Sequence, residues 1–288
     1  MASRLAAWSL AVVCLALVAS CGAPTPPPGE QYFADAKKNL AAMDYDAALN
    51  NLERTVRAAE GTPHGQQGLL LRVVLLTALA DTAKRMGEAY RIGARQPPAR
   101  ARTGQFGKMG SDYYGIARVR LMNAMEDFMK QRGKLGEQPL ELQVDFPDFT
   151  GSEHAALNKI REGYWVEDND RYRAQLETTR NALARLLARV AGTGDDLHKA
   201  HAAFAQGTVR MDSRLYLIEL SETFLKLAEM FGSRAMDDPR HQRICAEVVR
   251  DNLNLAHKLL AARPDKDLEG RMKKLRGECE KLLKSLAA

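Results

Sequence analysis

The chain has 288 residues, of which 45% are hydrophobic and 27% charged, a composition typical of a folded globular protein. Lys and Arg number 42 against 36 Asp and Glu, so the formal net charge is only +6. Because no block of like charges resembles a nucleic-acid-binding arm, we expect no nucleic-acid partner.

The first predicted element is a secretory leader that ends in a lipidation motif. Arg4 precedes an apolar stretch, Leu5 to Val18, that is too short to span a membrane comfortably. The sequence Val18-Ala19-Ser20-Cys21 then places two small residues between an aliphatic residue and a cysteine. This segment resembles the signal peptides of bacterial lipoproteins. The resemblance implies a signal peptide over residues 1–20 and an acylated Cys21 at the start of the mature chain; an ordinary cleaved signal peptide is the alternative.

The residue after this cysteine bears on which membrane holds the protein. Gly22 stands where an Asp usually retains Gram-negative lipoproteins at the inner membrane. The resemblance therefore implies an outer-membrane lipoprotein that faces the periplasm. Acyl chains such as palmitate contribute about 0.8 kcal/mol per buried CH₂, and stable anchoring takes more than one chain. Residues 21–30 contain the Pro-rich stretch Pro24 to Glu30, which predicts a semi-rigid tether.

Residues 31–288 are predicted to form one all-α domain. Apolar residues recur at spacings of three and four, and Ala and Leu dominate. Short links between consecutive helices favour antiparallel helix hairpins. The predicted helices span residues 30–43, 46–60, 66–94, 111–133, 152–165, 169–191, 195–206, 210–232, 238–262 and 265–286.

The first two predicted helices carry a repeat motif. Ala36 is a small residue at a helix contact, Met43-Asp44 makes the turn, Tyr45 packs into the groove, and Ala48 starts the second helix at a close approach. This pattern resembles a tetratricopeptide (TPR) repeat, in which a Gly is more usual at the turn. Later segments echo it at uneven spacing. The resemblance implies a TPR-like antiparallel helix-hairpin solenoid, whose hairpins stack to bury a core.

Two segments interrupt the helical pattern. Gln96 to Gly110 is rich in Pro, Gly and Arg and predicts a long basic loop with an exposed Phe106, either a contact site or a mobile insertion. Pro139 to Phe149 alternates apolar and polar residues, which predicts an extended segment with no second strand to pair with it. We expect this segment to lie along a helical surface; a strand offered to a partner's sheet edge is the alternative.

Two cysteines are candidates for a disulfide. Cys245 and Cys279 lie on the apolar stripes of the last two predicted helices, and Pro264 makes those helices fold back on each other. Counted outward from that turn, the cysteines fall at similar heights, and facing Cα atoms would be about 4–6 Å apart. An exported location supplies an oxidising environment. We therefore predict a Cys245–Cys279 disulfide, against the alternative of two unlinked core thiols.

Two further groups resemble metal sites but are better interpreted as helix starts. Asp195, His198 and His201 share a helical stretch with spacing that could bind Zn²⁺. Asp265-Lys-Asp-Leu-Glu-Gly270 resembles the first half of an EF-hand loop, but Arg276 stands where the bidentate Glu belongs. Acidic residues are favoured in the first turn of a helix by the helix dipole. Common phosphate-binding and serine-hydrolase motifs are missing from the sequence, so we expect no metal, no cofactor and no enzyme.

The two resemblances together imply a protein-interaction or scaffold module of the cell envelope, as in TPR-built envelope assembly factors and secretin pilotins, with cell-envelope proteins as partners. The alternative is a helical ligand-binding accessory subunit of a periplasmic solute transporter. A third possibility is a helical enzyme with a dispersed active site. An open groove lined by Asn, Arg and Tyr would favour the first, an enclosed apolar pocket the second, and a convergent cluster of buried carboxylates or histidines the third.

Overall fold

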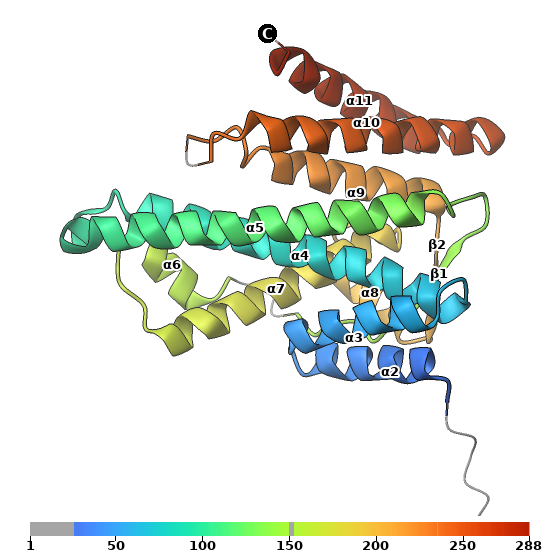
Figure 1. Cartoon of the computed structure of the whole chain (residues 1–288), viewed down its shortest axis with the longest axis horizontal. Helices are drawn as coiled ribbons and strands as arrows, with labels where there is room; N and C mark the ends of the chain where they lie inside the picture. Colours follow the sequence, from blue (N-terminus) through green and yellow to red (C-terminus); the bar gives the residue numbers. More distant parts are fainter. Residues whose placement is uncertain (1–25, 150–152, 235, 288) are drawn as a thin grey trace, which may run out of the picture.

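The computed structural model describes residues 26–149, 153–234 and 236–287. Within these ranges the chain forms ten α-helices, one 3-10 helix and two short strands, so the predicted all-α class is confirmed with a small two-stranded addition (Figure 1). The predicted signal peptide and Cys21 lie outside the described residues. None of the helices in these ranges combines the length and the hydropathy that crossing a bilayer requires.

The first hairpin is formed by α2 (Pro28–Ala41) and α3 (Tyr45–Ala58). The last three residues of the predicted tether therefore belong to a helix, because Pro is well tolerated in the first turn. Ala36 and Ala48 are fully buried, as the predicted close contact between the two helices requires. Met43 adopts φ of +59° in the turn, the backbone region that favours the Gly usual at this place.

Helix α4 (Pro63–Gly93) is the centre of the molecule. It contacts α2 and α3 on the N-terminal side, and also α5, α6, α7 and α9. Side chains around its whole circumference are buried, among them Leu71, Val74, Leu75 and Met86. Because each repeat of a solenoid contacts only its neighbours, this hub helix is a departure from simple repeat stacking.

Helix α5 (Thr103–Arg132) runs back along α4 (Figure 1). The predicted loop between them is wrong: Pro97–Arg102 is a 3-10 helix, η1, and α5 follows it directly. Phe106 is fully buried, with its ring centroid 5.4 Å from that of Tyr90 and 5.8 Å from that of Trp165. This aromatic packing outweighs the low helix propensity of the Gly-rich segment, because tertiary contacts override propensity.

The predicted extended segment contains strand β1 (Leu140–Gln143), which pairs antiparallel with β2 (Thr208–Met211). The prediction that no second strand pairs with it is therefore wrong. Leu142, Val144 and Phe146 are buried, as the alternating pattern predicts. Four residues of β2 are too few to show a period in the sequence, which explains why this strand was not predicted.

Between these strands lie α6 (Ala155–Arg161), α7 (Asp168–Val190) and α8 (Leu197–Phe204). After β2, the chain ends in α9 (Ser213–Ala228), α10 (Pro239–Ala262) and α11 (Lys266–Ser285). In Figure 1 these last three helices lie on the opposite side of α4 and α5 from α2 and α3. The layer order places α11 at one extreme of the molecule and α2 at the other.

Asp265 begins the last helix. Its Oδ1 accepts hydrogen bonds from the backbone N–H groups of Asp267 and Leu268, both at 3.1 Å. The acidic segment that resembles half of an EF-hand loop is therefore a helix N-terminus, where side-chain acceptors satisfy N–H groups that have no partner within the helix.

Candidate functional site

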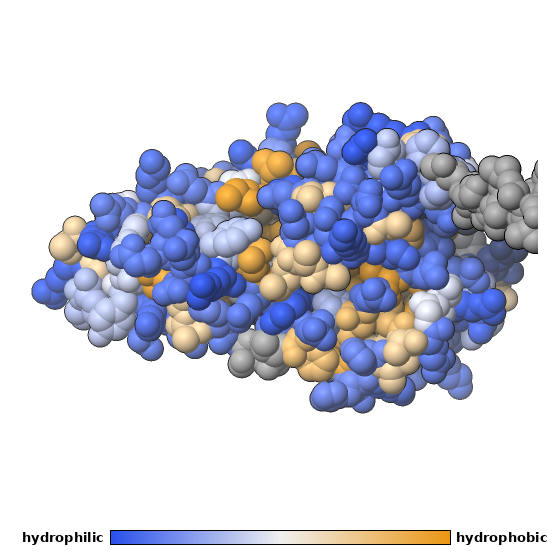
Figure 2. Space-filling view, turned by 90° about the horizontal axis from the view of Figure 1, so that it is seen from below, coloured by the Kyte–Doolittle hydropathy of each residue, from blue (hydrophilic) through white to orange (hydrophobic). Residues whose placement is uncertain are grey.

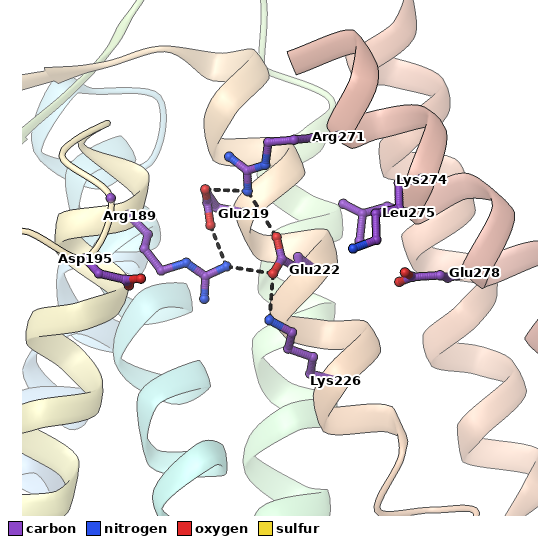
Figure 3. Close-up of a pocket in the computed structure, with 10 residues that line it drawn as sticks. Arg189, Asp195, Glu219, Glu222, Lys226, Arg271, Lys274, Leu275 and Glu278 are labelled. Carbon is purple, nitrogen blue, oxygen red and sulfur yellow. Dashed lines mark hydrogen bonds and ion pairs between the residues drawn. The ribbon is translucent and has the colours of Figure 1, made fainter. Parts of the chain in front are cut away.

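A charged pocket of about 590 Å³ lies between α7, α9 and α11 (Figure 3). Its lining is balanced in charge. The cations are Arg189, Lys226, Arg271 and Lys274, and the acidic residues are Asp195, Glu219, Glu222 and Glu278.

Glu219 is the centre of this pocket. Only 5% of its side chain is exposed, and its two oxygens lie 2.6 Å from Arg189 and 2.6 Å from Arg271. Glu222 binds the same two guanidinium groups, at 3.4 Å and 3.0 Å, and also lies 2.6 Å from the Nζ of Lys226. As Figure 3 shows, the two arginines come from α7 and α11 and converge on α9. The network therefore ties three helices together.

The electrostatics of this network do not suit proton transfer. Burial acts to raise the pKa of the Glu222 carboxyl, but hydrogen bonds from Lys226 and Arg271 and the charge of Arg189 outweigh it and hold that pKa below its ordinary value. A general acid or base works best with a pKa near the working pH. The convergent carboxylates that would favour an enzyme are present, but they are already bound by cations.

One feature of the sequence points to this network. Glu219 stands inside the apolar run from Leu215 to Leu220, and a carboxylate on a buried stripe requires a partner. The partners could not be read from the sequence, because Arg189 and Arg271 lie on helices far from α9 along the chain.

The predicted metal-type residues are not brought together. Asp195 lines the charged pocket, whereas the ring of His198 packs 5.3 Å from Phe149 and that of His201 packs 6.2 Å from Phe146, centroid to centroid. In the part of the chain that the structure describes, no three His, Cys, Asp or Glu side chains cluster closely enough to share a metal ion.

Cys245 and Cys279 lie on α10 and α11, which pack against each other as predicted. The structure does not join them: both thiols are free and buried, and the Sγ of Cys279 donates to the carbonyl oxygen of Ala246 at 3.0 Å. Burial raises the pKa of Cys245 to about 12 and also raises that of Cys279. The thiols are therefore poor nucleophiles, and the disulfide stays a prediction for the oxidised protein.

A second hollow, which we call the β1 groove, has a volume of about 770 Å³ and lies between the α3–α4 turn, the end of α5 and strand β1. Its apolar lining includes Val56, Leu69, Leu70, Leu135 and Leu140. Its polar lining is rich in amides and cations: Gln66, Gln67, Gln131, Gln138, Lys130, Lys134 and Arg210, with Glu60 and Glu141 beside them.

The glycines at the start of α4 position this groove. A Cβ on Gly65 would lie 2.0 Å from the carbonyl oxygen of Ala59, so only Gly lets α4 begin against the end of α3. The next turn presents Gln67, whose buried Oε1 has no hydrogen-bond partner among the described residues. A buried acceptor without a donor costs free energy, so this atom is a place where a ligand donor would be favoured.

The face seen from the α2 side carries no unbroken apolar surface. Figure 2 shows hydrophobic residues there, gathered mainly in one half, but hydrophilic residues interrupt them. Large interaction surfaces of obligate complexes are usually more continuous. The β1 groove is therefore the better-formed candidate for binding.

No known protein family, curated protein or solved structure matches the chain. The function proposed below therefore rests on the residues and their arrangement.

Proposed function

We propose that this protein is a membrane-anchored periplasmic lipoprotein that acts as a TPR-like interaction module and holds a peptide segment of a cell-envelope partner in the β1 groove. The observation that carries the proposal is the combination, in one groove of about 770 Å³, of an apolar floor with four Gln side chains. Its size falls within the range of about 300–1,000 Å³ that is usual for ligand sites.

The chemistry of the groove suits an extended peptide. A peptide presents an N–H donor and a C=O acceptor at nearly every residue, together with side chains that need apolar contact. Glutamine both donates and accepts, so the amides of Gln66, Gln67 and Gln138 can pair with either group, whereas the Oε1 of Gln131 already accepts from the Tyr216 hydroxyl at 2.7 Å. Leu69, Leu70 and Leu140 offer apolar contact, and a peptide N–H would satisfy the buried Oε1 of Gln67 once that side chain turns toward the groove.

The TPR-like part of the proposal rests on the first hairpin. The buried Ala36 and Ala48 and the left-handed turn at Met43 support TPR-type packing of α2 against α3. Because α4 contacts helices far from it in the chain as well as its neighbours, we assign TPR-type packing only to the N-terminal end of the module. The lipidation motif at Cys21 supports the membrane anchor.

The charged pocket supports the alternative, a solute-binding accessory subunit, less well than the groove supports a peptide. Glu219 and Glu222 are already bound by Arg189, Arg271 and Lys226. A charged solute would have to break these ion pairs before it could form its own, and a buried charge left without its partner is strongly unfavourable.

Site-specific crosslinking in intact cells tests the proposed function. A photo-reactive amino acid is placed at Gln66 or at Gln138, both exposed groove residues, and as a control at Glu247, an exposed residue of α10. We expect the same discrete crosslinked partner from both groove positions and none from the control. Adding Gln138→Trp, which fills the groove, should abolish the product formed at position 66. Equal products from the groove and control positions, or none from the groove, would contradict the proposal.

A further inference from the structure

The net charge of the protein is concentrated in its last hairpin. Helices α10 and α11 together carry eleven Lys and Arg against six Asp and Glu. This excess of five accounts for nearly all of the net charge of +6 of the whole chain. The charges of the remainder of the chain nearly cancel in sum, although the segment between Glu88 and Asp112 is also basic.

The positive charge is further concentrated on the outer face of α11. Five exposed lysines lie on this face: Lys266, Lys273, Lys274, Lys281 and Lys284. Lys274 lies at its edge and also lines the charged pocket. At 3.6 residues per turn they fall within an arc of about 100° and span about 27 Å along the helix. The opposite face, with Met272, Leu275 and Cys279, is buried. We call the five residues the lysine stripe.

The lysine stripe forms no direct ion pair in the described ranges. None of the five lysines lies within ion-pair distance of an acidic side chain there, although many other cations of the protein do. Glu269, Glu278 and Glu280 stand four residues from Lys273, Lys274 and Lys284 without reaching ion-pair distance. The positions four residues after Lys266 and Lys273 are Gly270 and Gly277.

These two glycines are not required by the packing of the protein itself. A Cβ built on either one would have no heavy atom within 4 Å. Each glycine costs about 1 kcal/mol relative to Ala inside a helix. They lie two turns apart among the lysines, and a helix surface without side chains at such points lets another backbone approach closely.

The occupant that fits this face is an acidic helix. Opposite charge steers and orients partners, and a stripe about 27 Å long matches a helix of about 18 residues. A membrane surface fits less well, because interfacial helices bury an apolar face, and the exposed large apolar side chains of the described residues all lie outside α10 and α11. In Figure 1, α11 also lies at the far side of the molecule from α2, where the chain leads toward the proposed anchor.

We propose that the lysine stripe of α11 is a docking surface for an acidic helical segment of a partner protein. This site is separate from the β1 groove. The lysines attract the acidic helix and fix its position along α11. Gly270 and Gly277 let its backbone approach α11 closely.

Binding of a synthetic probe tests the proposal. The probe is a fluorescent 21-residue helical peptide with Glu along one face, and its control carries Gln at the same positions. The protein is the full chain, solubilised in a neutral detergent. We expect the Glu peptide to bind, and binding to weaken about tenfold or more when Lys266, Lys273, Lys281 and Lys284 are all changed to Gln. The matched control changes four exposed lysines elsewhere, Lys38, Lys108, Lys159 and Lys199, to Gln and should leave the affinity nearly unchanged.

A second variant separates docking from simple charge attraction. Gly270→Gln with Gly277→Gln keeps the charge and raises helix propensity, so the melting temperature should stay the same or rise while the peptide affinity falls. The proposal is overturned if both sets of lysine substitutions weaken binding equally, if the glycine substitutions leave the affinity unchanged, or if the protein binds phosphatidylglycerol vesicles but not the Glu peptide.

Discussion

Glu219 links α9 to α7 and to α11 through two ion pairs. Its carboxylate is nearly buried on α9 and contacts Arg189 of α7 and Arg271 of α11. A buried ion pair adds little compared with an apolar replacement, but removing one partner leaves charges without compensation. The charged pocket is therefore characterised by the ion pairs of a few side chains and not by an enclosed cavity.

The first prediction concerns this carboxylate. Glu219→Gln should lower the free energy of unfolding by about 2–3 kcal/mol, less than for a fully buried pair because Arg271 is partly exposed and Glu222 remains to bind both arginines. Glu278→Gln removes a carboxylate from the same pocket that has no ion pair in the described residues, and should change stability little. Urea unfolding followed by circular dichroism measures both. If both variants lose the same free energy of unfolding, the proposed stabilising role of the Glu219 ion pairs is refuted.

The second prediction concerns acid stability. The pKa of Glu222 is lower in the folded protein than in the unfolded chain, so its contribution is present at neutral pH and is lost as the pH falls through its folded pKa. Stability should therefore decline below about pH 4–5, where unfolded glutamates take up protons. Glu222→Gln should make this decline shallower. Unfolding measured across pH 3–7 (about the range of carboxylate titration) checks this, and an unchanged slope would contradict it.

At the scale of elements, the sequence predicted the long helices well because their apolar periods extend over many turns. The predictions failed where contacts distant in the chain decide the structure. Phe106 holds a Gly-rich segment in α5 by packing against Tyr90 and Trp165, and β1 is defined by pairing with β2. The sites could not be predicted for the same reason. The β1 groove combines residues of α3, α4, α5 and both strands, and no local sequence motif indicates it.

The third prediction tests the packing of the first hairpin. Ala36→Leu or Ala48→Leu should overpack the contact between α2 and α3 and cost about 1–3 kcal/mol. Ala34, which is exposed on the same helix as Ala36, gives the matched control Ala34→Leu. The control should melt near the wild-type temperature. If both buried-site variants also melt there, TPR-type packing is absent from this hairpin.

The fourth prediction concerns the link between α10 and α11. In protein purified from the periplasm we expect a Cys245–Cys279 disulfide, since the two helices pack together and the proposed location would be oxidising. Closing this loop would contribute up to about 3.5–4 kcal/mol on the chain-entropy estimate. Unfolding and alkylation without reductant, followed by mass measurement, distinguishes the states. Two alkylated cysteines would refute the disulfide and agree with the free thiols of the structure.

At the scale of the whole molecule, the proposal assigns different roles to different sides of one helical body. The N-terminal hairpin lies at one extreme, α11 with its lysine stripe lies at the other, and α4 connects the layers between them (Figure 1). The β1 groove lies beside the N-terminal hairpin and would therefore be held near the membrane. The lysine stripe would face away from it.

The central claim is that this helical module works at a membrane surface through an acylated Cys21. The fifth and most direct test is to grow cells expressing the full chain with a fatty-acid probe and to compare wild type with Cys21→Ser. We expect the wild type to be labelled and to sediment with the outer membrane, and the variant to be unlabelled and either released or left unprocessed. A wild-type protein that carries no label would contradict the claim.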